Sequence, residues 1–108
     1  MDTICVLAQD NPTADILTTL YTVPASTSTV VSSIIVCNLD VVSINFSISV
    51  AVGGASNTPA QYIYYQVALD VNDTFIATVG LSLATTDVIR VWSSSSNVAF
   101  NIFGDQIT

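Results

Sequence analysis

Apolar and polar residues alternate along most of the chain, with the period of two that is typical of half-buried β-strands. Clusters of Asp, Asn, Gly, Pro and Ser, which are common turn residues, separate these stretches. The pattern predicts about eight short strands at the spacing of a sandwich or barrel. The predicted strands are residues 3–9, 15–23, 30–39, 43–52, 61–69, 74–79, 88–93 and 98–107.

The fourth predicted strand alternates most regularly. Its apolar residues Ile44, Phe46, Ile48, Val50 and Val52 point to one side, and small or polar residues point to the other. One side of this strand is therefore predicted to face the core.

Composition supports an all-β fold. Val, Ile and Thr supply 39 of the 108 residues, and β-branched side chains favour strands over helices. A chain of this length is expected to form one domain, residues 1–108. We therefore expect a two-sheet antiparallel β-sandwich of about eight strands, with a jelly-roll or immunoglobulin-like topology. Trp92 follows both cysteines in the chain, which disfavours a true antibody-type domain.

The charge balance excludes several classes of partner. Eight Asp residues and one basic residue, Arg90, give a formal net charge of −7. Nucleic-acid binding requires Lys or Arg to neutralise phosphates, so we expect no nucleic-acid partner. Anionic membranes would repel this chain, and the uncharged run 16–39 contains Pro24 and has strand periodicity, so we predict no membrane partner. The N-terminal residues are acidic where a secretion signal is basic, so the protein is expected to remain where it is made.

Chemically reactive groups are scarce. The chain has no His and no Lys, the usual bases that activate a Ser or Cys nucleophile, so we predict no enzymatic activity and no cofactor. The acidic turn 70–73 offers oxygen ligands for Ca²⁺ but lacks the spacing and the Glu of a twelve-residue calcium loop. Cys5 and Cys37 have no zinc-ligand spacing, so no metal site is predicted. These cysteines are either two buried thiols or a disulfide between strands.

Five residues are candidates for contact with another protein: Tyr62, Tyr64, Tyr65, Arg90 and Trp92. Tyr62 and Tyr64 are predicted to share one face of their strand, with Tyr65 on the other. Tyrosine is enriched at interfaces, although these rings could also be half-buried in the core. Arg90 is predicted to make one ion pair or carbonyl contact, within the chain or across a subunit boundary.

The predicted strands lack the features that usually protect sheet edges. The chain has no Lys, and its prolines fall in loops, whereas native edge strands are often blunted by Lys, Pro or inward-pointing charges. Outward positions carry mainly Ser, Thr and Asn, which pack against another protein with less desolvation cost than charges. We therefore expect a symmetric homo-oligomer.

Several segments resemble small all-β virion structural proteins of tailed bacteriophages, of the capsid decoration or cement type. The resemblance covers most of the chain and rests on residues 17–24, 30–38, 72–80, 83–89 and 103–108. The sequence departs from that pattern at residues 39–41, where related proteins often have a basic or Gly-rich turn.

The resemblance implies a non-enzymatic protein on the capsid exterior, made in the host cytoplasm. Such proteins are commonly trimers that bind the major capsid protein and bridge its subunits. Two alternatives stay open. One is a head–tail or tail adaptor, or a fibre module that binds glycans. The other is a soluble carbohydrate- or calcium-binding sandwich.

Overall fold

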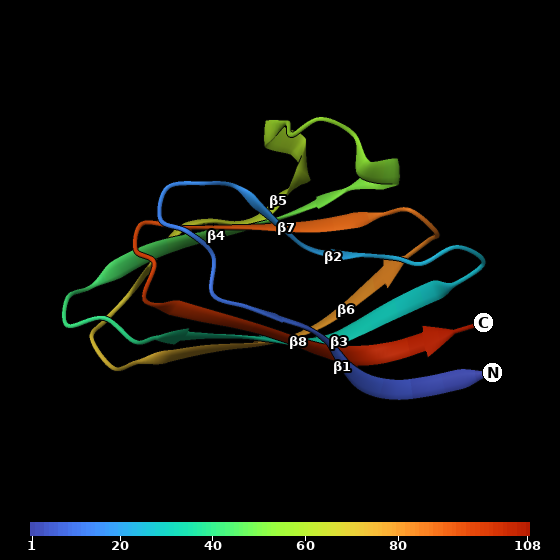
Figure 1. Cartoon of the computed structure of the whole chain (residues 1–108), viewed down its shortest axis with the longest axis horizontal. Helices are drawn as coiled ribbons and strands as arrows, with labels where there is room; N and C mark the ends of the chain where they lie inside the picture. The colour runs from blue at the N-terminus through green and yellow to red at the C-terminus, as the bar shows by residue number, and fades with distance from the viewer.

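Eight strands form two four-stranded antiparallel sheets in the computed structural model, which describes all residues from 1 to 108 (Figure 1). The strands are β1 (Asp2–Asp10), β2 (Thr18–Thr22), β3 (Ser28–Asn38), β4 (Ile44–Ala51), β5 (Tyr62–Leu69), β6 (Thr74–Leu83), β7 (Val88–Ser93) and β8 (Val98–Ile107). The predicted all-β sandwich is therefore confirmed.

The A sheet has the strand order β1-β8-β3-β6, and the B sheet has the order β2-β7-β4-β5. The first strand pairs with the last, the second with the seventh, the third with the sixth and the fourth with the fifth. This nesting is what results when one long antiparallel hairpin is rolled up, and it is the jelly-roll arrangement. Of the two predicted topologies, the immunoglobulin-like one is therefore wrong.

The inner faces of both sheets form the core. Ile44, Phe46 and Ile48 of β4 are buried there, as their alternation predicts. The ring of Phe46 contacts those of Phe75 and Phe100, with centroid separations of 5.0 and 6.3 Å. These aromatic contacts join β4 of the B sheet to β6 and β8 of the A sheet, so they hold the two layers together.

Two predicted strand boundaries differ from the observed ones by three or more residues. The second strand begins at Thr18 rather than at Asp15, because Asp15 has a positive φ of 60° that ends regular extended structure. The sixth strand continues through Gly80 to Leu83. The predicted strand ended at Val79, before Gly80, but Thr78 and Leu81 are both paired with β3, one on each side of a register shift. That shift is a bulge, which absorbs the extra residue without ending the strand.

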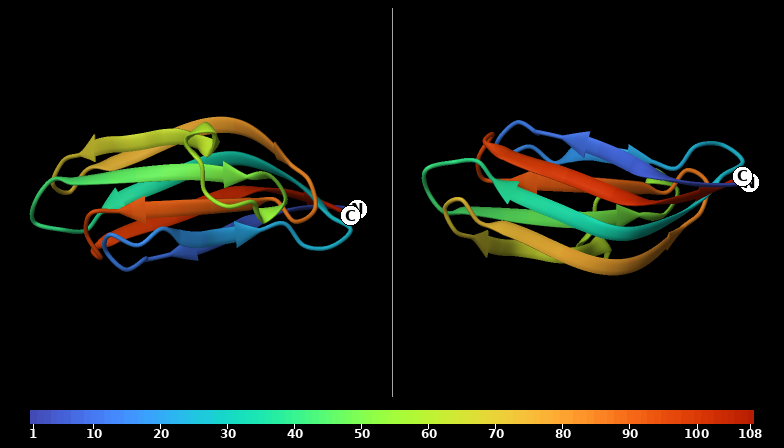
Figure 2. Two further views of the ribbon diagram at one scale, coloured as in Figure 1. Left: turned by 90° about the horizontal axis from the view of Figure 1, so that it is seen from above. Right: turned by 90° about the horizontal axis from the view of Figure 1, so that it is seen from below.

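The connection between β4 and β5 lies over the outer face of the B sheet. It contains two short 3-10 turns, η1 (Val52–Gly54) and η2 (Pro59–Gln61). Figure 2, from above, shows this segment crossing the B sheet, whereas the view from below shows the A sheet with nothing over its outer face. Val52 was predicted to face the core, but it belongs to this segment and is 77% exposed.

Cys5 and Cys37 are both free and half-buried. They flank β8, where Cys5 pairs with Gly104 and Cys37 pairs with Ala99. Five residues along a strand span about 17 Å, and a disulfide requires Cα atoms within about 7 Å. A disulfide within the chain is therefore impossible in this fold, and neither thiol is fully buried.

The helical segments are both single 3-10 turns, and no helix is long and apolar enough to cross a bilayer. The two chain termini lie together at one end of the sandwich (Figure 1), where the Thr108 amide donates to the Met1 carbonyl at 2.9 Å.

Candidate interaction surfaces

Four of the five predicted interface residues share the outer face of the B sheet. Arg90 and Tyr62 both pair with Ser49 of β4, which points away from the core because its neighbour Ile48 points into it. Trp92 follows Arg90 by two residues on β7 and therefore lies on the same side. The Tyr65 ring contacts Tyr62 at a centroid distance of 4.9 Å.

Tyr64 lies on the opposite face, so the prediction that it shares a face with Tyr62 is wrong. Ile48 pairs with Tyr64, but the next β4 residue, Ser49, pairs with Tyr62. The strand β5 therefore has one extra residue at this point, a bulge that turns Tyr62 outward. The Tyr64 ring packs edge-on against Phe75 at 5.1 Å, on the core side.

The prediction that Tyr65 lies on the face opposite Tyr62 is therefore also wrong, and a second bulge lies next to Tyr65. Between the pairs Phe46–Val67 and Ile48–Tyr64, β5 again has one residue more than β4. Gln66 takes a positive φ of 50° there, and its amide donates to the Ser47 hydroxyl at 2.9 Å. Because the bulge amide is satisfied by a buried side chain, this irregularity is a stable part of the fold.

Arg90 fixes the segment that covers the B sheet. Its guanidinium donates to the carbonyls of Ala55 at 2.8 Å and Gly54 at 3.2 Å. From the other side, the Gly53 amide donates to the Asp87 carboxylate at 2.9 Å. Gly53 and Gly54 have positive φ angles of 62° and 73°, which glycine adopts without steric strain. Of the alternatives predicted for Arg90, the structure shows carbonyl contacts within the chain.

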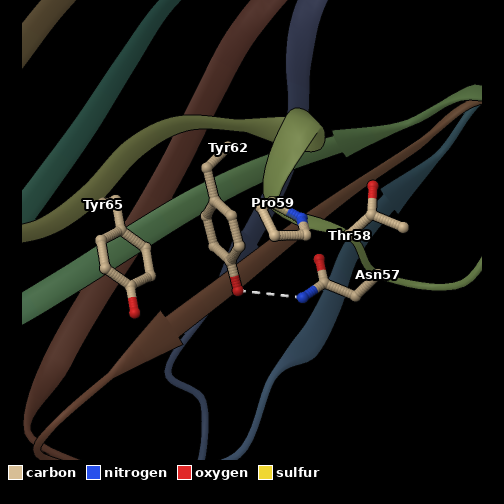
Figure 3. A pocket seen from close by; sticks show the side chains of 5 residues that line it. All are labelled: Asn57, Thr58, Pro59, Tyr62 and Tyr65. Atoms are coloured by element: carbon tan, nitrogen blue, oxygen red, sulfur yellow. Dashed lines mark hydrogen bonds between the residues drawn. The ribbon is translucent and has the colours of Figure 1, made fainter.

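A hollow of about 350 Å³ opens beside the outward tyrosines. Its lining residues come from the covering segment and the start of β5: Asn57, Thr58, Pro59, Tyr62 and Tyr65 (Figure 3). The Asn57 amide donates to the Tyr62 hydroxyl at 3.0 Å. Contact of Tyr62, Tyr64, Tyr65, Arg90 and Trp92 with another protein stays a prediction.

The outer face of the A sheet carries exposed apolar residues among neutral Ser, Thr and Asn side chains. Strand pairing aligns Ile35 with Ile76, and Val6 with Phe103, on the side away from the core. Ile4 is 87% exposed and Ile76 is 65% exposed. Carboxylates on this face lie near one end, at Asp2 and Asp105, which pair with Ile107 and Ile4. Most of this face could therefore meet another protein without burying a charge.

The two sheets differ at their edges. The A-sheet edges β1 and β6 have nine and ten residues, each with one register irregularity. The B-sheet edge β2 has only five residues, and β5 contains two bulges. Short or bulged strands are poor templates for pairing with another chain. The predicted lack of edge protection is therefore more marked in the A sheet, whose edge strands are longer, than in the B sheet.

An apolar tip, defined by Leu39, Val41, Val42 and Val71, projects at the end of the sandwich opposite the termini (Figure 1). These side chains are between 43% and 84% exposed. This surface was not predicted from the sequence, although three apolar residues flank Asp40 at the end of the predicted strand 30–39.

Asn38 holds the tip in place. Its buried side-chain amide lies within 3.2 Å of the carbonyls of Val42, Leu69 and Asp70. Its side-chain oxygen accepts from the Asp40 amide at 2.8 Å. One side chain thus joins the β3–β4 loop to the β5–β6 turn, and the apolar residues are carried on braced loops.

Asp40 adds a second brace. Its carboxylate accepts hydrogen bonds from the Ser95 hydroxyl and from the Val41 amide. These hydrogen bonds, chiefly that of Ser95, hold the pKa of Asp40 below its usual value of 3.8.

The acidic turn after β5 serves backbone structure. The Asp73 amide donates to the Asp70 carbonyl at 3.1 Å, and the Asp73 carboxylate accepts from the Thr74 amide at 2.8 Å. Asn72 takes the positive φ of 58° that this turn requires. No cluster of three or more Asp, Cys, Glu or His side chains is placed to hold a metal ion.

The chain matches no protein-family model, and no curated protein matches it.

Proposed function

We propose that this protein is a non-enzymatic structural protein of a bacteriophage virion, a decoration (cement) protein that binds the outside of the head and stabilises contacts between major capsid subunits. The observation that carries the proposal is the outer face of the A sheet, an uncovered and mostly uncharged surface with exposed isoleucines, bounded by two long edge strands. A surface of this kind favours burial against other proteins.

Two surfaces serve two kinds of contact in this proposal. The A-sheet face and its edge β6 meet other copies of the chain, which assemble as a trimer. The apolar tip, with Val41 84% exposed, inserts into the major capsid protein. Rigid apolar side chains of this kind lose little conformational entropy on binding, which favours affinity.

The proposed role needs buried area and no reactive group. Each interface between capsid subunits that the protein bridges gains association free energy. The total over all bridged interfaces opposes the pressure of the packaged genome. A net charge of −7 keeps the protein from competing for DNA.

The hollow beside Tyr62 and Tyr65 favours a second candidate, an adaptor or fibre module that recognises glycans. Such a module is present in few copies per particle and lies away from the head.

The deciding experiment is an electron-microscopic map of purified particles that contain the protein, combined with heat and osmotic-shock survival of particles that lack it. A decoration protein is expected at many symmetry-related positions on the head, and its removal should lower survival. Location at the neck or tail in few copies would select the second candidate. A protein found on no particle would contradict both.

A further inference from the structure

The hollow beside the outward tyrosines differs in chemistry from the apolar surfaces. It is lined by two tyrosines, Asn57, Thr58 and Pro59, and no charged side chain is among them. Its volume of about 350 Å³ lies at the lower end of the range for small-molecule sites, roughly 300 to 1,000 Å³. A small and uncharged ligand is therefore the best match.

The polar atoms around the hollow include both donors and acceptors. The Tyr62 hydroxyl oxygen accepts from the Asn57 amide, so the Tyr62 O–H proton is left to donate and the Asn57 side-chain oxygen is left to accept. The hydroxyls of Thr58 and Tyr65 can do either. A ligand with several neutral hydroxyl groups needs this mixture.

The aromatic rings supply the complementary apolar contact. Tyr62 and Tyr65 meet edge to face, with an interplanar angle of 74°, and Tyr65 is 66% exposed. Figure 3 shows the Tyr62 ring between Tyr65 and the Pro59 ring. The negative face of an aromatic ring attracts polarised C–H groups, such as those on the apolar side of a pyranose.

The covering segment holds this arrangement in advance of binding. Ten residues, 52–61, separate β4 from β5, whereas hairpin loops usually have about two to five. The only basic side chain of the protein, Arg90, fixes this segment through the Gly54 and Ala55 carbonyls, and Gln61 donates to the Ser56 carbonyl at 2.9 Å. A preformed site loses less entropy on binding.

We infer that the hollow is a binding site for a neutral saccharide of one or two pyranose units. Anionic sugars are disfavoured by the net charge of −7. A proline-rich peptide would need an extended groove, because each turn of a polyproline helix spans about 9 Å. The site does not depend on the proposed binding to the head, and it specifies the ligand class of the second candidate function.

Ligand-observed NMR on the full chain tests the site. The probes are the methyl glycosides of glucose, galactose, mannose and N-acetylglucosamine, together with lactose, each at millimolar concentration. At least one should bind. Tyr65→Ala should weaken that binding by about tenfold, as for loss of one aromatic contact, and Tyr62→Phe should weaken it several-fold. Ile16→Ala is the matched control, because Ile16 is 54% exposed in the loop before β2 and does not line the hollow, and it should leave binding unchanged.

Three results would overturn the inference: no binding of any probe, binding that Tyr65→Ala leaves intact, or binding of a polyproline peptide in place of every sugar. Circular dichroism of each variant shows whether the fold is kept. If Tyr65→Ala does not fold, Tyr62→Phe still tests the site, because it keeps the aromatic ring and removes only the hydroxyl group. Binding of the same variants to purified phage heads is measured in parallel. Saccharide binding without head binding would contradict only the proposed function, and the reverse would contradict only this site.

Discussion

The two sheets of this jelly roll have the same number of strands but present opposite surfaces. The A sheet leaves its outer face uncovered and has edge strands of nine and ten residues. The B sheet is covered by residues 52–61, which Arg90 anchors, and its edges are short or doubly bulged. Figure 2 shows both outer faces.

This difference shows how one alternating pattern can produce two kinds of surface. Bulges in β5 and the long β4–β5 connection convert the outer face of the B sheet into a small polar and aromatic site. The A sheet lacks such a cover, so its outward isoleucines and its edges remain available to other proteins. The proposed protein contacts and the inferred ligand site therefore lie on opposite layers.

The largest expected effect comes from the centre of the A sheet. A Cβ added at Gly104 of β8 would lie 2.0 Å from the Val30 carbonyl oxygen and 3.0 Å from Leu7 Cδ1. Gly104→Ala should therefore separate β8 from β3 and lower the free energy of unfolding by about 3 kcal/mol. Thermal unfolding should show a decrease in Tm of at least about 10 °C.

Gly80→Ala is the matched control in the same sheet, because a Cβ at Gly80 meets nothing within 4 Å. It should raise stability by about 0.5 kcal/mol, since alanine loses less backbone entropy on folding. Equal losses for the two variants would show that the close packing of β8 is not what stabilises the A sheet.

The next effect concerns the unequal edges. Ile76→Lys places a charge in the middle of the exposed face of β6, and Ala68→Lys places the same charge on exposed β5. In the proposed trimer, burial of an unpaired ammonium should weaken self-association by about 2 kcal/mol, or roughly thirtyfold. Sedimentation velocity should show dissociation for Ile76→Lys only. The edge comparison fails if Ala68→Lys dissociates the oligomer equally.

A smaller effect is expected at the segment that covers the B sheet. Arg90→Lys keeps the charge but loses the planar fork that reaches both the Gly54 and Ala55 carbonyls. Stability should fall by about 1 kcal/mol, since the contact is partly exposed to water. Hydrogen exchange should accelerate at residues 52–61, while β6 amides serve as the internal reference. Unchanged exchange in the segment would mean that Arg90 does not anchor it.

The smallest effect links pH to the loop that connects the two sheets. The lowered pKa of Asp40 means that its hydrogen bonds stabilise the fold above pH 3.8 and that this contribution is lost as the pH falls through the folded-state pKa. Ser95→Ala removes the hydrogen bond that contributes most to the lowered pKa, so it should raise the pKa of Asp40 toward 3.8. An NMR titration of the carboxyl carbon measures the change. Ser96→Ala, a neighbouring serine, should leave that pKa in place.

The strand pattern was predictable because each strand has one face in the core. Ile44, Phe46 and Ile48 alternate for that reason, and the turn at residues 70–73 follows from its Asp and Asn side chains. The bulges were not predictable. They depend on how β5 pairs with β4, and one extra residue reverses the face of Tyr62.

The sequence by itself determined an all-β sandwich, the approximate extent of its strands and the scarcity of reactive groups, because these follow from local alternation and composition. Only the tertiary structure decided the jelly-roll order, the pairing of Tyr62 with Tyr65 and the anchoring of residues 52–61 by Arg90. Each of these depends on contacts between residues far apart in the chain, and strand periodicity carries no information about which strands become neighbours.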